Sequence, residues 1–101
     1  MSGGHMELPD PKPPTEKDQD ILDKVKEKFV EQSKTNPSEF KAILVITLIV
    51  NYVHSEVYLF KVYTGGSTYS HLKVFDTTLD EGTKLEKFQL NKTLDDKLEF
   101  F

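Results

Sequence analysis

The spacing of apolar residues between positions 15 and 36 predicts one long helix. These residues recur at intervals of one, three and four, which places them on a single stripe of a helix of about five turns. Thr15 followed by Asp18 resembles a capping box, and Pro37 disfavours helical backbone at Asn36, so we expect the helix between these points. The stripe consists of Ile21, Leu22, Val25, Phe29 and Val30.

After Glu39 the chain changes to runs of β-branched and aromatic residues, which predict strands. The Gly65-Gly66 pair between two of these runs suits a tight hairpin, because such a turn requires positive φ angles. One long helix followed by an antiparallel meander predicts an α+β fold with the helix stripe packed on one face of the sheet. The short runs are Val57 to Tyr63, Tyr69 to Phe75, Leu85 to Asn91 and Leu98 to Phe101.

The segment from Phe40 to Tyr63 is apolar on both faces of the strand that it predicts. Such a strand needs cover on both sides, either from a second core layer or from another chain. Fully extended, the segment would span roughly 80 Å, whereas a globule of this size is only about 35 Å across. It therefore turns between Asn51 and Glu56 or exchanges with a partner. One face carries Ile43, Val45, Thr47 and Ile49, and the other carries Ala42, Leu44, Ile46, Leu48 and Val50.

The composition fits one small folded domain after a short arm. The chain has 101 residues, of which 37% are hydrophobic and 30% charged, enough for a single core. Residues 1–14 hold four of the five prolines and predict an extended arm, whose first six residues look like a cloning remnant. Residues 15–101 then form the domain.

Charge and cysteine content exclude several classes of partner and site. All thirteen basic residues are Lys, and the formal net charge is −4, so we expect neither nucleic acid nor an acidic membrane surface as a partner. The absence of Cys excludes disulfides and thiolate metal sites. The start of the chain has no features of a secretory signal, and no run reaches the ~20 apolar residues of a membrane helix, so we expect a cytoplasmic protein.

The candidate chemical groups do not assemble into a catalytic site. His54 and His71 have no partner at metal-ligand spacing, and Ser70 and His71 point to opposite faces of a strand. The Asp95-Asp96 pair lies in a polar stretch without an apolar pocket that would tune its pKa. We therefore expect no catalytic residue, no metal and no cofactor, so the chain is not an enzyme and its function lies in a binding surface.

Several strings of the sequence are similar to those of one protein family. The chain resembles the stefins, the intracellular single-domain cystatins, over residues 13–42 and 57–101. This resemblance implies a cystatin-like fold with one long helix on a five-stranded antiparallel sheet. The strings are Ile21 to Lys26, Phe40 to Ala42, His71 to Phe75, Phe88 to Lys92 and Asp95 to Phe101.

The resemblance also implies reversible inhibition of papain-like cysteine proteases. Stefins insert a wedge into the protease cleft, made from an N-terminal Gly, a hairpin reading Gln-x-Val-x-Gly and a second hairpin carrying Leu-Pro. The corresponding positions here are Gly4, Val53 and Leu79. Ser55 replaces the Gly of the first hairpin, and no Pro follows Leu79, so we expect weakened inhibition.

An alternative function is self-association. The chain could be an engineered or non-inhibitory stefin-like scaffold whose long apolar strand drives domain exchange. Residues 50–55 contain no Gly that would favour a closed turn. The side chains expected to promote association are Leu44, Ile46, Leu48 and Val50. This hypothesis predicts a homodimer or higher oligomer at micromolar concentration.

Overall fold

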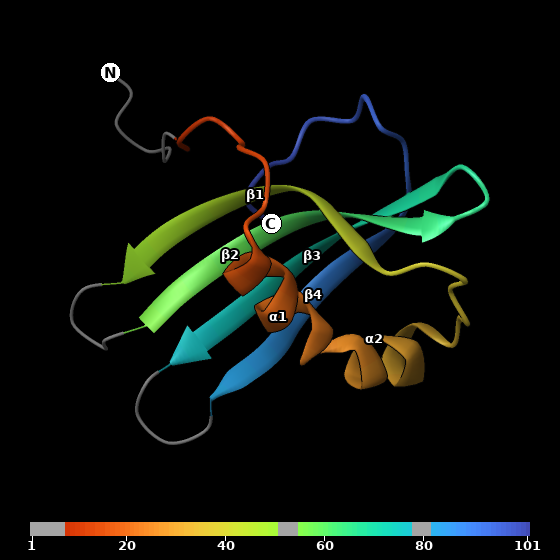
Figure 1. Cartoon of the computed structure of the whole chain (residues 1–101), viewed down its shortest axis with the longest axis horizontal. Coiled ribbons are helices and arrows are strands. Elements are labelled where there is room, and N and C mark those ends of the chain that lie inside the picture. Colours follow the sequence, from red (N-terminus) through yellow and green to blue (C-terminus); the bar gives the residue numbers. More distant parts are fainter. Residues whose placement is uncertain (1–7, 51–54, 78–81) are drawn as a thin grey trace.

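The computed structural model describes residues 8–50, 55–77 and 82–101, apart from the side chain of Val50. Two helices, α1 (Glu16–Asp23) and α2 (Lys26–Ser33), precede the strands β1 (Lys41–Val50), β2 (Ser55–Gly65), β3 (Thr68–Thr77) and β4 (Thr83–Lys92). The strands form one antiparallel sheet in the order β1-β2-β3-β4, and the helices lie across one face of it (Figure 1). The predicted α+β class is confirmed.

The predicted helix is present in the expected place but is divided into two segments. Thr15 and Asp18 form the expected capping box at its start. At Val25 the backbone N–H donates to the carbonyl of Leu22, three residues back instead of four, and this tighter turn separates α1 from α2. The expectation of one uninterrupted helix is therefore wrong, although the stripe residues Ile21, Leu22, Val25 and Phe29 are all buried as predicted.

The long apolar segment turns back within its own chain. β1 pairs with β2 in an antiparallel register that ends at the pair Val50 and Ser55. A bulge at Ile43 shifts the alternation of β1, so that Ala42 lies in the core beneath the helices instead of sharing a face with Leu44. The sequence-based assignment of Ala42 to the other face is wrong for this reason.

The sheet has a core on each of its two faces. The larger core, beneath the helices, includes Phe29, Val45 and Phe60. The smaller one, on the opposite face, forms around Ile46, Leu59 and Leu98, with Leu8, Leu44, Leu48 and Phe101 packed against it. The apolar face that needed cover is therefore covered by the C-terminal segment and the arm of the same chain.

The C-terminal segment also differs from the sequence-based expectation. Residues 98–101 form no strand, and the described residues contain four strands in place of the expected five. Leu98 is 3% exposed because it packs on the face of the sheet, not beside β4 at its edge.

Two buried lysines hold the C-terminal segment on the sheet. The Lys61 Nζ donates to the carbonyl oxygens of Thr93, at 3.0 Å, and Leu94, at 2.7 Å, and also to that of Asp96. Lys73 donates to an oxygen of Phe101 at 2.9 Å and pairs with Glu86 at 3.0 Å. These charge-assisted hydrogen bonds fix the segment over the smaller core.

Candidate functional site

The strand ends that flank the β1–β2 and β3–β4 connections, here called the hairpin ends, lie side by side at one end of the sheet. Ser55, the first residue of β2, pairs with Val50 of β1 on one side and with Thr77 of β3 on the other. Thr77 in turn donates its backbone N–H to the carbonyl of Gly82 at 3.1 Å, next to the start of β4. The ends of β1 and β3 and the starts of β2 and β4 therefore lie next to one another (Figure 1).

The N-terminal arm runs toward the same end. Lys12 and Val45 exchange two backbone hydrogen bonds, of 3.0 and 2.9 Å, in an antiparallel bridge. Because the bridge is antiparallel, residues that precede Lys12 continue in the direction of the end of β1. Leu8 follows this path and packs against the smaller core together with Leu48. Three separate stretches of the chain thus converge at one end of the molecule.

The three residues that the sequence comparison singles out cannot be placed individually. Gly4, Val53 and Leu79 all lie outside the described residues. Of the side chains proposed for self-association, Leu44, Ile46 and Leu48 belong to the smaller core, and Ile46 is 2% exposed. The side chain of Val50 is outside the described part of the chain.

Ile49 is an exposed apolar residue at this end that the sequence analysis does not single out. Its side chain is 70% exposed, and it pairs with Glu56 across β1 and β2. Beside it, the Tyr58 hydroxyl donates to Glu56 Oε1 at 2.9 Å, and burial together with this carboxylate raises the pKa of Tyr58. The exposed position of Ile49 near the end of β1 depends on the register of the strand, so it could not have been found from the sequence alone.

The polar groups elsewhere do not form a reactive constellation. Ser70 faces the helix side, whereas His71 lies on the opposite face, where burial and the nearby charge of Lys61 lower its pKa to about 4. Within residues 8–50, 55–77 and 82–101, no group of three or more His, Asp or Glu side chains could hold a metal ion. In the same ranges, no helix is long and apolar enough to cross a membrane.

Comparison with known proteins gives close relatives over the whole chain, although no family model matches. The chain is 36% identical over 103 residues to cystatin-A8 of Sus scrofa, covering 100% of this chain and 94% of that protein. It is 33% identical, with the same coverage, to leukocyte cysteine proteinase inhibitor 1 of Sus scrofa. It is 35% identical over 95 residues to cystatin-A of Mus musculus, covering 93% and 95% of the two chains.

These identities extend over nearly the full length of both partners in each comparison. They agree with the α+β fold of the described residues. The chain therefore belongs to the stefin family, the type 1 cystatins.

Proposed function

We propose that this protein is a reversible, non-catalytic inhibitor of papain-like cysteine proteases. The relatives named cystatin-A and leukocyte cysteine proteinase inhibitor support this function. The observation that carries it is the convergence of the arm, the β1–β2 hairpin and the β3–β4 hairpin at one end of the sheet. An edge built from three neighbouring segments can fill a cleft without presenting a single extended peptide for cleavage.

The proposed mechanism depends on a rigid support for these segments. β2 lies between β1 and β3 in the sheet. Its residues Val57, Leu59 and Phe60 are each no more than 6% exposed. A support that does not reorganise on binding reduces the entropic cost of association. The segments that reach the protease in this proposal contain Gly4, Val53 and Leu79.

We expect weaker inhibition than is typical of the family. Ser55 stands where the first hairpin of stefins has Gly, and it is buried between two strands as the first residue of β2. Glycine lets two backbones approach more closely than any other residue does. No Pro follows Leu79 to restrict the second hairpin. The serine reduces the fit of the first hairpin to a protease cleft, and the missing proline reduces the preorganisation of the second hairpin.

Charged substitutions in the two hairpins test this proposal. We expect Val53→Asp and Leu79→Asp each to weaken papain inhibition by about tenfold or more, because burying an unpaired carboxylate in an interface is unfavourable. Gln32→Asp, on the exposed surface of α2, is the matched control and should leave the inhibition constant unchanged. Equal inhibition by all three variants and the unmodified protein would place the contact surface elsewhere.

The cellular location and the domain division belong to the same proposal. A chain without cysteine needs no oxidising compartment, which supports action in the cytoplasm. Residues 15–101 form the inhibitory domain, and residues 1–14 form the arm that reaches the protease. Within the arm, the bridge at Lys12 supplies the attachment to β1.

Domain exchange remains a separate prediction. In an exchanged dimer, β1 of one copy would pair with β2 of the other in the same register, so the smaller core around Ile46 would be conserved. The hinge from Val50 to Ser55 has no Gly to favour the closed turn. Light scattering at micromolar concentration should then give the mass of a dimer. The mass of a single chain at every concentration would eliminate exchange.

A further inference from the structure

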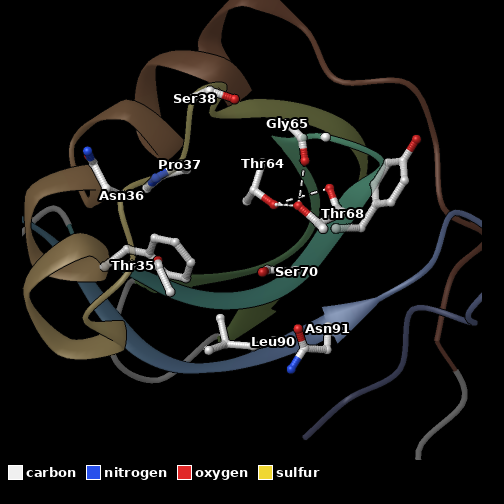
Figure 2. Close-up of a pocket in the computed structure, with 13 residues that line it drawn as sticks. Thr35, Asn36, Pro37, Ser38, Thr64, Gly65, Thr68, Ser70, Leu90 and Asn91 are labelled. Atoms are coloured by element: carbon white, nitrogen blue, oxygen red, sulfur yellow. Dashed lines mark hydrogen bonds between the residues drawn. The ribbon is translucent and has the colours of Figure 1, made fainter.

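A cavity of about 380 Å³ lies away from the hairpin ends, beside the connection between β2 and β3. Its walls come from the loop between α2 and β1, from the β2–β3 turn and from the end of β4 (Figure 2). Because β2 and β3 are antiparallel and continuous, this turn and the β1–β2 and β3–β4 connections lie at opposite ends of the strands. The cavity is therefore separate from the proposed protease-contact surface.

The lining combines an apolar floor with a neutral polar rim. Pro37 and Leu90, both partly exposed, contribute the apolar part, while Asn36, Thr68 and Asn91 bring amide and hydroxyl groups. None of the described residues that line the cavity carries a charge. An ion that entered the cavity would lose its hydration without gaining a charged partner, so the cavity favours a neutral ligand.

Ser70 adds a hydroxyl to the lining of the cavity. The residue is 3% exposed, and its side chain makes no hydrogen bond within the described part of the chain. Figure 2 shows its oxygen among the residues that surround the cavity. A hydroxyl that faces a cavity can both donate a hydrogen bond to a ligand and accept one from it.

The walls of the cavity are held in place before any ligand binds. The hydroxyls of Thr64 and Thr68 lie 2.7 Å apart, and Thr68 Oγ1 donates to the Gly65 carbonyl at 2.6 Å. Gly65 has φ +98°, and a Cβ at this position would lie 2.0 Å from Ser38 Oγ. The turn therefore packs directly on the α2–β1 loop, and this preorganisation lowers the cost of binding.

We propose that this cavity binds a small neutral ring molecule that carries hydroxyl groups. One face of the ring lies on the apolar surface of Pro37 and Leu90, and its hydroxyl groups bond to Ser70 and the rim amides. A pyranose sugar and an aromatic diol share this chemistry. The site is independent of protease inhibition, since no residue that lines it belongs to the arm or to the strand ends beside the β1–β2 and β3–β4 connections.

Titration of the ¹⁵N-labelled protein tests the proposal. N-acetylglucosamine and resorcinol are the two probes, and glucuronate is the charged control. We expect saturable amide shifts confined to residues 35–38, 64–70 and 90–91 with at least one neutral probe, and at least threefold weaker binding of glucuronate. Saturation by one probe identifies the ring chemistry, whereas saturation by neither, or equal binding of glucuronate, overturns the proposal.

Two variants separate the cavity from a general surface effect. Ser70→Ala removes only the hydroxyl that faces the cavity, and we expect it to weaken binding of the successful probe about threefold to tenfold. Thr47→Val removes a hydroxyl from β1, outside the cavity, and should change nothing. Unchanged binding by Ser70→Ala would overturn the assigned contact. Papain inhibition measured at saturating probe should equal that without it, so failure of either proposal is recognised independently of the other.

Discussion

At the scale of single residues, His71 is a buried group whose ionisation is coupled to the fold. It is 1% exposed, and its Nε2 has no hydrogen-bond partner among the described residues. Lys61 lies opposite His71 in the register of β2 and β3. Burial and the charges of Lys61 and Lys92 disfavour protonation of the imidazole, and Asp96 partly compensates. The imidazole is therefore held neutral beneath the C-terminal segment.

This environment predicts a loss of stability in acid. The pKa of His71 is lowered from 6.5 to about 4, so the unfolded chain binds the proton more tightly. Above pH 6.5 the imidazole is neutral in both the folded and the unfolded chain, so His71 does not lower the free energy of unfolding. As the pH falls from 6.5 to about 4, the unfolded chain is protonated first, which lowers the free energy of unfolding by at most about 3 kcal/mol. His71→Gln should show a smaller decline in urea denaturation over this range. An identical decline for both proteins would show that other groups cause it.

At the scale of secondary-structure elements, the helical stripe is the main attachment of α1 and α2 to the sheet. Phe29 is 1% exposed and contacts the rings of Phe40 and Phe88 at centroid distances of 5.5 and 5.4 Å. We expect Phe29→Ala to lower the free energy of unfolding by about 3–5 kcal/mol, since it leaves a cavity among these rings. Lys28→Ala is the control because its ion pair with Glu31 is exposed. A near-neutral Phe29→Ala would mean that α2 is not docked.

The elements also show which features of the fold a sequence can predict. The helix stripe and the strands around Gly65 follow from local spacing and turn chemistry, so they were predictable. The break at Val25, the bulge at Ile43 and the path of Leu98 depend on contacts between distant segments. An alternating pattern alone does not indicate whether the last apolar run forms a strand or covers a face.

The candidate site was predictable only through the family resemblance. No local pattern distinguishes the residues of the arm and of the two hairpins from ordinary connections. Their convergence results from strand pairing, through Ser55 between Val50 and Thr77, and from the bridge at Lys12. The exposure of Ile49 likewise depends on the register of β1 and on which part of the sheet the helices cover.

At the scale of the whole molecule, the protein is one framework with two independent ends. The end formed by the hairpins and the arm carries the proposed inhibitory surface, and the β2–β3 end carries the neutral cavity. The C-terminal segment joins β2 and β3 on the opposite face through Lys61 and Lys73. Substitutions at the hairpin ends should therefore alter protease binding without altering the core.

The most direct test measures papain inhibition by two proteins in the same assay. One is the unmodified chain, and the other carries Gln-Val-Val-Ala-Gly in place of residues 51–55, which restores the family sequence of the first hairpin. We predict weak, competitive and reversible inhibition by the unmodified chain, and at least tenfold tighter inhibition by the restored one. If neither protein inhibits papain at micromolar concentration, this framework does not present an inhibitory edge and the central claim is wrong.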